Sequence, residues 1–401
     1  QDRLYELAHR YQMPLVLFSE GMGRLSNYGR KSGRVNMDTT MFAEFAKLSG
    51  LVPLVGINTG ECFGGNAALL GCCDVIIATK QSSLGMTRPD ILHAFGGEAE
   101  TESGSGIEAQ VSNGVVDLLA ENDREAAQQA RRYLSYFQGS TRTWDSADQR
   151  YMRHIIPEDR VRTYEVRDII NTLADTDSVM ELRRDFGIGI ITAFFRIEGR
   201  PLGLVANNPV HLAGAIDSDG ADKGTRFLQL CDAFDIPVLT MMDCPGIMVG
   251  PDHEREALVR HCARMFNVGA NLTTPMFGLV VRKAYGLGVQ AMCGASSLVP
   301  FFTVAWPTAE FAGMNIDGGV KLSSRRELMA IEDPEERKEA YDRKVSQAYE
   351  GARAVNSAGN AYGIDDIIDP ADTREWLIRG LKSLPSKTER VGKKRPNIDT
   401  W

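Results

Sequence analysis

Residues 282–292 (RKAYGLGVQAM) follow an apolar segment, 275–281 (PMFGLVV), that has the length and β-rich composition of a buried strand. Gly286 and Gly288 allow the chain to turn tightly as it leaves this strand. The segment carries no useful acid or base, so a site here would act through backbone amides. Two N–H groups, next to the positive end of a helix that begins near Val289, suit an oxygen that becomes negative during a reaction. A glycine turn that merely ends a strand is the simpler alternative, because a short glycine pattern alone is a weak signal.

The chain contains this arrangement twice. The aligned segments are 51–70 (LVPLVGINTGECFGGNAALL) with 273–292, at an offset of 222 residues, and 14–23 (PLVLFSEGMG) with 237–246 (PVLTMMDCPG), at an offset of 223. The alignment pairs Gly64 with Gly286 and Glu20 with Asp243. One residue of slippage separates the two offsets, and self-similarity at a fixed period is the signature of a repeat. We therefore expect a duplicated α/β domain.

A β-hairpin is predicted in the second copy only. Residues 187–208 (GIGIITAFFRIEGRPLGLVANN) have its pattern, with the turn at residues 198–200. In the first copy the equivalent place falls before Gln1, so we expect the sequence to begin inside a domain whose first hairpin lies upstream. The polar stretch 139–185 marks the boundary between the copies. The predicted units are a first domain at 1–156, a second domain at 157–385 and a mobile basic tail at 386–401.

The composition excludes several classes of protein. With 401 residues, 43% hydrophobic and 24% charged, the chain can build two ordinary globular domains with their own cores. A net charge of −8 argues against nucleic acid as a partner. The sequence has no apolar run of about 18 residues and no signal-like start, so we expect no membrane span and a cytoplasmic protein, or a mitochondrial matrix protein if the source is eukaryotic.

The seven cysteines favour buried, reduced side chains. They are Cys62, Cys72, Cys73, Cys231, Cys244, Cys262 and Cys293, and they lie mostly in apolar segments. No Cys-x-x-Cys pair and no cluster of histidine and cysteine has the spacing of metal ligands. The sequence therefore predicts no metal site.

A glycine-rich, basic loop follows the first predicted strand, at residues 21–37 (GMGRLSNYGRKSGRVNM). Its cations, which include Arg24, could meet the phosphates of a ligand if the loop faces a cleft. A solvated surface loop is the commoner explanation for such a segment.

Several motifs resemble the carboxyltransferase domain of biotin-dependent acyl-CoA carboxylases. They are 205–217 (VANNPVHLAGAID), 231–250 (CDAFDIPVLTMMDCPGIMVG), 281–292 and 305–308 (AWPT). The motif GLGVQAM, together with 70–78 (LGCCDVIIA) and 133–139 (YLSYFQG), is most similar to single-chain carboxylases that accept long or varied acyl-CoAs. The resemblance covers nearly the whole chain. It implies a fold of two tandem crotonase-like ββα-spiral domains, the first without its initial hairpin.

The resemblance also implies the reaction, in which a carboxyl group moves from carboxybiotin to the α-carbon of an acyl-CoA through an enolate. It assigns the amides of Gly64 and Gly65 to the thioester oxygen, and those of Leu287 and Gly288 to the ureido oxygen of biotin. Each such donor contributes roughly 2.7–4 kcal/mol to lowering the barrier. The substrate-binding residues that it implies are Gly21, Gly23, Arg24, Phe63, Tyr285, Gly286, Val289 and Gln290. Biotin freed of its carboxylate can take the α-proton itself, so His93, His211 and His261 are interpreted as structural.

The same resemblance implies partners. The Met-Lys-Met context of a biotinyl lysine and the ATP-binding glycine-rich loop of a biotin carboxylase are both absent from the sequence. A biotin carboxyl carrier and a biotin carboxylase, which uses ATP and bicarbonate, must then lie on other domains or subunits. A homodimer or larger homo-oligomer is implied, such as a dimer of trimers, in which the first domain of one protomer faces the second domain of its mate. Residues 87–97 (TRPDILHAFGG) replace a glycine-rich segment of the close family, which leaves the choice of acyl-CoA open.

Other functions stay open on these residues. A biotin-dependent decarboxylase would use the same site in reverse. A crotonase-type hydratase or thioesterase without biotin would need an inward pair of acids, such as Glu61 with a second carboxylate, and Glu61 stands alone in the sequence. The third alternative is a degenerate structural subunit that shapes an oligomer.

Overall fold

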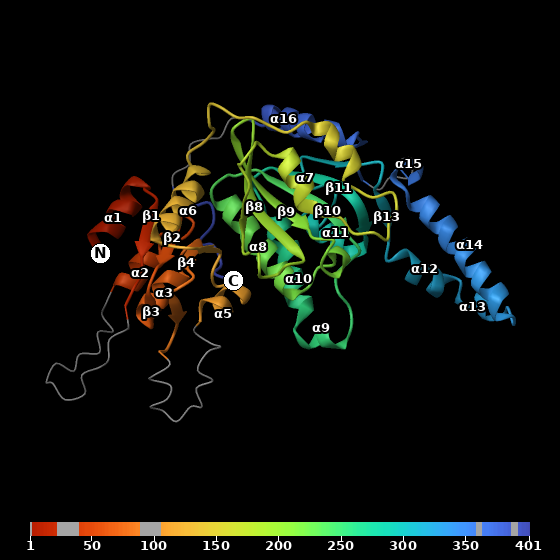
Figure 1. Cartoon of the computed structure of the whole chain (residues 1–401), viewed down its shortest axis with the longest axis horizontal. Coiled ribbons are helices and arrows are strands. Elements are labelled where there is room, and N and C mark those ends of the chain that lie inside the picture. Colours follow the sequence, from red (N-terminus) through yellow and green to blue (C-terminus); the bar gives the residue numbers. More distant parts are fainter. Residues whose placement is uncertain (1, 22–39, 89–105, 358–362, 386–391) are drawn as a thin grey trace, which may run out of the picture.

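The computed structural model describes residues 2–21, 40–88, 106–357, 363–385 and 392–401. They form two main β-sheets with helices around them (Figure 1). The first sheet is parallel, with the strand order β1-β2-β4-β6, and β3 pairs with β5 beside it. Its strands are β1 (Leu15–Phe18), β2 (Leu54–Asn58), β3 (Glu61–Phe63), β4 (Val75–Thr79), β5 (Ser83–Gly85) and β6 (Leu118–Ala120). The helices on this side are α1 (Asp2–Tyr11), α2 (Met41–Ala46), α3 (Gly65–Gly71), α5 (Ile107–Ser112) and α6 (Asp123–Ser135).

The second sheet has the order β14-β12-β11-β10-β9-β8-β7, with β13 paired to β11. Its strands are β7 (Met180–Leu182), β8 (Ile190–Ile197), β9 (Arg200–Asn207), β10 (Val238–Cys244), β11 (Met276–Tyr285), β12 (Phe302–Ala305), β13 (Glu310–Ala312) and β14 (Asp366–Ile367). Its α-helices are α7 (Val166–Leu173), α8 (Ser218–Ala233), α9 (Pro251–Arg255), α10 (Leu258–Ala270), α11 (Gly286–Met292), α12 (Ile316–Ser323), α13 (Arg325–Met329), α14 (Pro334–Ala352), α15 (Ala354–Ser357) and α16 (Thr373–Ser383). The described residues also include the short 3₁₀ helices η1 (Gln149–His154), η2 (Leu212–Gly214) and η4 (Pro370–Asp372).

The strand pairings of the first sheet recur in the second. β1 and β2 pair Leu15 with Leu54, while β10 and β11 pair Val238 with Met276, the residues 223 and 222 positions further along. In the same way β2 pairs with β4 as β11 pairs with β12, and β4 pairs with β6 as β12 pairs with β14. The duplication read from the sequence is therefore present in the backbone register.

The predicted hairpin is β8 and β9, which are antiparallel and turn at Glu198 and Gly199, two residues with positive φ. β9 then pairs with β10, so that β10 lies inside the second sheet. In the part of the chain that the structure describes, β1 has β2 as its only ladder neighbour and stands at the edge of the first sheet.

Helix α8 forms the centre of the molecule, between the two sheets (Figure 1). Almost every residue of α8 is buried, and one hydrophobic core combines its apolar residues with strands of both sheets. Several of its buried polar side chains have partners, as is usual for buried polar groups, although the Ser218 hydroxyl and Arg226 Nε have none in the described part of the chain. Arg226, for example, donates to the carbonyls of Cys73 and Asp74 in the first copy, at 3.3 and 2.7 Å.

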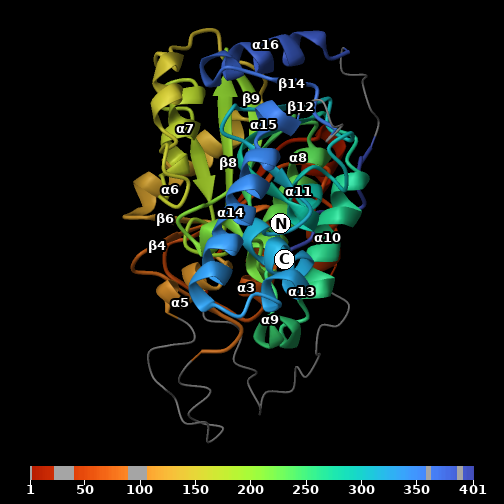
Figure 2. The ribbon, with the colours of Figure 1, turned by 90° about the vertical axis from the view of Figure 1, so that its right-hand side faces the viewer.

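The helices α12 to α15 form an arm on the side of the molecule that is remote from the first sheet, and α16 covers the second sheet from outside (Figures 1 and 2). The 3₁₀ helix η1 lies close to η4, and Arg153 of η1 pairs with Asp369 at 2.8 Å. The buried Met152 of η1 belongs to the core of the second sheet.

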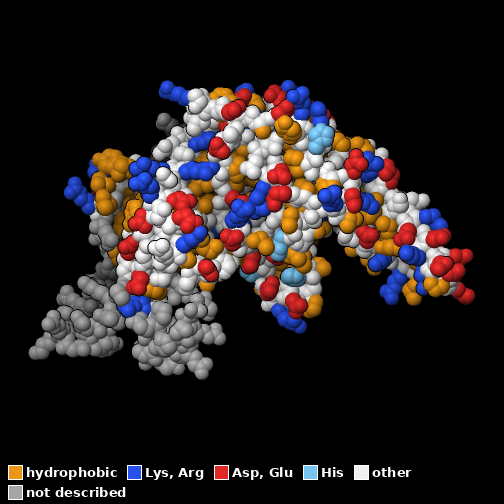
Figure 3. Space-filling model, viewed as in Figure 1, with side chains coloured by type: hydrophobic (Ala, Val, Ile, Leu, Met, Phe, Trp, Pro, Cys, Tyr) orange, Lys and Arg blue, Asp and Glu red, His pale blue; other side chains and the backbone are white. Residues whose placement is uncertain are grey.

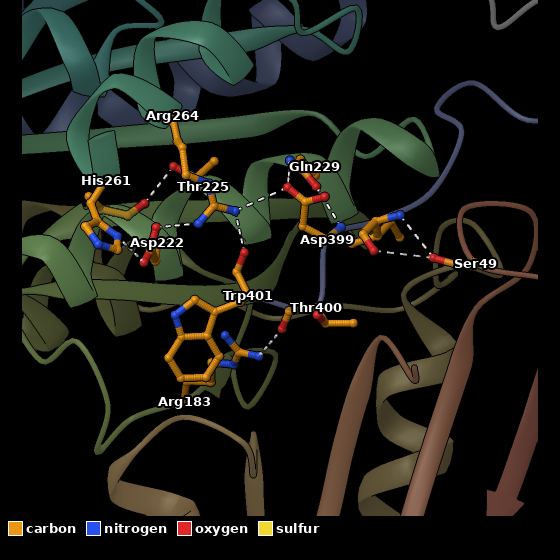
Figure 4. Close-up of polar contacts among 12 residues, drawn as sticks. Ser49, Arg183, Asp222, Thr225, Gln229, His261, Arg264, Asp399, Thr400 and Trp401 are labelled. Carbon is orange, nitrogen blue, oxygen red and sulfur yellow. Dashed lines mark hydrogen bonds and ion pairs between the residues drawn. The ribbon is translucent and has the colours of Figure 1, made fainter. Parts of the chain in front are cut away.

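Residues 392–401, predicted as part of a mobile tail, pack between the two copies (Figure 4). Ile398 is only 4% exposed, and its amide donates to the Ser49 hydroxyl of the first copy at 3.0 Å. Asp399 accepts hydrogen bonds from Gln229 and Arg264 of the second copy, at 2.8 and 3.2 Å. The basic composition has a physical reason: the cations supply counter-charge to carboxylates at the end of α8. Lys394 and Arg395 pair with the buried Asp232, at 3.1 and 2.9 Å.

Candidate active site

The glycine turn of the second copy joins β11 to α11. The helix begins at Gly286, so the expected start near Val289 is wrong by three residues. Gly286 adopts a φ of +57°, which a glycine reaches without strain and which lets the helix start directly at the end of the strand. Leu287 and Gly288 consequently lie in the first helical turn, where N–H groups have no acceptor four residues earlier in the helix.

Gly288 is buried against the turn that follows β10. A Cβ at this position would lie 2.5 Å from the Cys244 sulfur and 2.8 Å from the carbonyl carbon of Gly246. Both distances are shorter than a carbon atom tolerates, so any larger residue must displace the backbone. Leu287, in contrast, is 62% exposed. The amide pair therefore stands at the surface of a protomer, on a tightly packed base.

A cavity of about 380 Å³ adjoins this turn. The residues that line it include Gly286, Leu287, Val289, Gln290, Cys293, Ser297 and Phe311. Three of the predicted substrate-binding residues, Gly286, Val289 and Gln290, thus share one cavity. Tyr285 is buried, and its hydroxyl donates to Glu310 at 2.6 Å. Burial, followed by the Glu310 carboxylate, raises the pKa of Tyr285 far above its ordinary value, so this hydroxyl stays protonated.

The glycine turn of the first copy shares one backbone angle with the second, although its helix begins one residue later in the repeat. Gly64 has a φ of +62°, close to the value of Gly286, its partner in the repeat. Gly65 opens α3, and the ring of Phe42 lies 3.2 Å from where a Gly65 Cβ would be. The amide of Gly64 donates to the carbonyl of Gly85 at 3.3 Å, a long hydrogen bond. By the repeat, Asn66 is equivalent to Gly288, and its amide is the next in this turn.

The other residues predicted for the first copy divide into two groups. Gly21 has a φ of +136°, and it bridges β1 to β3 through hydrogen bonds to Glu61 and Phe63, at 2.6 and 3.0 Å. Phe63 is buried beside it. Gly23, Arg24, His93 and most of residues 87–97 lie outside the described residues. Glu61, the acid on which a hydratase would depend, is exposed on β3.

A buried charge cluster lies behind the second glycine turn, and sequence analysis did not identify it. Asp243, at the end of β10, accepts hydrogen bonds from the Arg282 Nε, the Lys283 amide and the Tyr164 hydroxyl, and it forms an ion pair with the Lys283 Nζ. These four distances lie between 2.9 and 3.1 Å. The only signal for it was the pairing of Asp243 with Glu20 in the repeat.

Two cysteines beside this turn are held in the protonated, unreactive form. Burial raises the thiol pKa of both Cys244 and Cys293 to about 12, so both stay protonated. His211 lies 3.6 Å from Asp217, and His261 lies 2.6 Å from Asp222. Both histidines therefore contact α8 or the residue that caps it. The turn offers amides rather than a side-chain base.

The described ranges offer neither a metal site nor a membrane-spanning helix. No group of three or more His, Cys, Asp or Glu residues there is placed to hold a metal ion. No helix of the described chain has both the length and the apolar character that crossing a membrane requires.

The chain is similar to known proteins over nearly its whole length. The family described as "Carboxyl transferase domain" matches residues 3–398. The methylmalonyl-CoA carboxyltransferase 12S subunit of Propionibacterium freudenreichii subsp. shermanii is 33% identical over 391 residues, which cover 94% of this chain and 72% of that protein. The propionyl-CoA carboxylase carboxyltransferase subunit of Haloferax mediterranei is 30% identical, and the match covers 73% of that protein.

Solved structures give the same assignment. A single-chain, multi-domain long-chain acyl-CoA carboxylase superposes with a TM-score of 0.87 and 45% identity over 94% of this chain, which spans 37% of that longer protein. The transcarboxylase 12S structure with methylmalonyl-CoA bound superposes with a TM-score of 0.86 and 29% identity. The match covers 99% of this chain and 77% of the transcarboxylase chain. These matches confirm both the resemblance and the two-part crotonase-like fold that it implied. The chain belongs to the carboxyl transferase domain family.

Proposed function

We propose that the chain transfers a carboxyl group between biotin and the α-carbon of an acyl-CoA, through an enolate that backbone amides stabilise. The observation that carries the proposal is the pair of equivalent glycine turns, in which Gly64 and Gly286 share a positive φ and each precedes amides in a first helical turn. Amides held in place before the reaction stabilise developing negative charge without reorganisation. The reaction creates such charge on two oxygens, which matches two turns.

Each turn has one role in this proposal. The amides of Gly64 and Gly65 hold the thioester oxygen of the acyl-CoA, and the 3.3 Å hydrogen bond from Gly64 to Gly85 is long enough for a ligand oxygen to replace. The amides of Leu287 and Gly288 hold the ureido oxygen of biotin. Biotin, carried by another domain or subunit, supplies the carboxyl group and accepts the α-proton. The protonated thiols of Cys244 and Cys293 suit this division, because the chain needs no base of its own.

The cavity beside α11 fits a small bicyclic ring. Its volume of about 380 Å³ falls in the usual range of ligand pockets, and its lining combines apolar side chains such as Val289 with a few polar ones such as Gln290. We propose that Gly21, Gly23, Arg24 and Phe63 hold the acyl-CoA at the first turn, and that Val289 and Gln290, at the exit of this cavity, meet only the end of the acyl chain and so set the preference for its length. The solved and curated relatives act on CoA thioesters of different length, so these positions are where the chain would select its substrate.

The two turns must face each other across a dimer interface. Within one protomer α3 and α11 lie in different halves of the ribbon, with α8 between them (Figure 1). Large apolar side chains are exposed near both turns, namely Phe18, Phe42 and Met86 near the first and Leu287, Leu298 and Phe301 near the second. Contact with a second copy would bury them. Figure 3 shows a hollow between α9 and the arm of α12–α14. The arm itself exposes Leu322 and Met329.

The function is tested in two steps with the full-length protein. In the first, a panel of carboxylated acyl-CoAs is incubated with free biotin, and biotin-dependent loss of the carboxylate is measured. In the second, the protein with its carrier and biotin carboxylase receives ATP, labelled bicarbonate and a panel of acyl-CoAs. We expect both directions to proceed. Loss of carboxylate without any fixation of bicarbonate would show that the protein is a decarboxylase and would contradict the proposal. Inactivity in both, with hydration or hydrolysis of the thioester, would favour a biotin-independent enzyme.

A further inference from the structure

Strands β10 and β11 pair irregularly just before the glycine turn of the second copy. Met242 pairs with Val280, but the next pair is Cys244 with Ala284, so β11 carries two extra residues opposite Asp243. Such an irregularity leaves backbone groups without a ladder partner. The Asp243 carboxylate takes the place of that partner, because it accepts the Lys283 amide at 3.1 Å.

The same carboxylate collects three side-chain donors from two segments of the chain. Arg282 Nε and the Tyr164 hydroxyl both reach Oδ2, at 3.0 and 2.9 Å, and Lys283 Nζ reaches Oδ1 at 3.1 Å. Arg282 in turn donates to the carbonyl of Arg162 at 2.8 Å, and its guanidinium lies over the Tyr164 ring. Asp243 is 1% exposed, and a buried carboxylate with charged partners is bound firmly to a single geometry.

This cluster controls the amide pair from two directions. Lys283 is the residue three before Gly286, at the end of the strand that leads into the turn. Cys244 and Gly246 follow Asp243 directly and form the surface against which Gly288 packs. A shift of either segment would move the amides of Leu287 and Gly288 relative to a bound oxygen.

We propose that Asp243 is a positioning residue for the Leu287 and Gly288 amides, acting through the Lys283 backbone and the Cys244–Gly246 turn. The inference rests on the proposed function and extends it beyond the glycine turn to the residue that fixes its geometry. Asp243 does not touch the substrate in this account. Its loss should lower the rate of the chemical step and leave the affinity for acyl-CoA nearly unchanged, because the acyl-CoA binds at the other turn.

The test compares two buried carboxylates in the full-length enzyme. Asp243→Asn is expected to reduce kcat by at least about 30-fold with the KM for acyl-CoA changed less than about threefold, since a misplaced oxyanion donor loses much of its effect. The matched control is Asp175→Asn. Asp175 is also buried and bound by an arginine, Arg374, and it accepts the amides of Glu198 and Gly199 far from the glycine turn. Asp175→Asn should lose stability but keep its kcat within about twofold.

Asp243→Asn leaves two cations without their counter-charge and could fail to fold. Tyr164→Phe is the second variant, because it removes one neutral donor and keeps the ion pairs. Burial and the nearby Asp243 raise the pKa of Tyr164, so the native hydroxyl donates at all working pH values. We expect its kcat to fall about three- to tenfold at unchanged KM. Equal kcat values for wild type and these variants would overturn the inference. An inactive wild type would instead refute the proposed function.

Discussion

Strand β10 and its counterpart β1 occupy equivalent places in the two copies, yet their surroundings differ. β10 lies between β9 and β11 and is buried along its whole length. In β1 half-buried residues alternate with exposed ones, and the Phe18 side chain is exposed to solvent. The helices before them differ in the same way, because α8 is buried while α1 exposes Leu4 and Tyr11. The repeat therefore specifies pairing and turn geometry, and the neighbouring elements decide what is buried.

The acids at the ends of these strands repeat this contrast. Glu20, just after β1, and Asp243, near the end of β10, both lie where the strand pairing becomes irregular. In the first copy Phe18 pairs with Ile57, and the next bridge joins Gly21 to Cys62. Glu20 is exposed and is bound by the Thr59 hydroxyl, whereas Asp243 is buried with four donors. The second turn should thus depend more on its acid than the first.

The largest effect is expected from Gly288→Val, which breaks the second turn alone. The new side chain would collide with Cys244 and Gly246, so the amides move and kcat should fall about 10²- to 10³-fold, with little loss of acyl-CoA binding. Steady-state kinetics with varied acyl-CoA measure both quantities. Gly351→Ala is the control, because a Cβ at Gly351 meets nothing within 4 Å. Unchanged turnover in Gly288→Val would contradict the assignment of biotin to this turn.

The contact between the copies is tested at Ile398. Ile398→Ala removes a buried side chain from the segment that bridges Ser49 and α8, and we expect a loss of about 2–4 kcal/mol in the free energy of unfolding. Urea denaturation measures it, and Val355→Ala, at an exposed position, is the control. Equal stability of the two variants would mean that residues 392–401 do not hold the copies together in solution.

The first copy should carry a pH dependence of stability through Asp74. Burial raises the pKa of Asp74 to about 7, from 3.8 when it is unburied. Between these values the folded state holds a proton that the unfolded state has lost, so this group makes stability fall as the pH rises. The slope reaches at most about 1.4 kcal/mol per pH unit. Urea denaturation at pH 5, 6 and 7 should show a shallower fall for Asp74→Asn, while the exposed Asp148→Asn keeps the wild-type slope.

The smallest effect is expected at the acid of the first turn. Glu20→Gln keeps an acceptor for Thr59 in an exposed place, so kcat should fall less than about threefold, against the much larger loss in Asp243→Asn. The same kinetic assay compares them. Losses of equal size would show that both acids position their turns alike, and the contrast between the copies would disappear.

Sequence analysis predicted the parts of the molecule that local pattern and the repeat encode. The strand β11 and the hairpin β8–β9 both follow from periodicity and turn chemistry. The start of α11 was misplaced because two glycines favour a longer turn than the strand end requires. The packing of residues 392–401 could not be foreseen, since their partners Asp232 and Ser49 lie far away in the sequence.

The candidate site was predicted only as far as its glycines. Gly64 and Gly286 were found because the repeat aligned them, and their matching φ values agree with that alignment. Asp243 was paired with Glu20 but given no role, because its donors come from residues 164 and 282–283 and meet only in the fold. Gly23 and Arg24 stay predictions, outside the described residues.

The central claim is that the first turn of one protomer works with the second turn of its mate, and subunit mixing tests it most directly. Gly64→Val disables the first turn, because valine does not adopt a φ of +62°, and Gly288→Val disables the second. A mixed dimer of the two inactive variants has one intact site, made from the unaltered turn of each chain. We expect mixing to restore up to about half of the activity per mixed dimer. Absence of any recovery, with mixed dimers shown to form, would contradict the account and place both turns of a site on one chain.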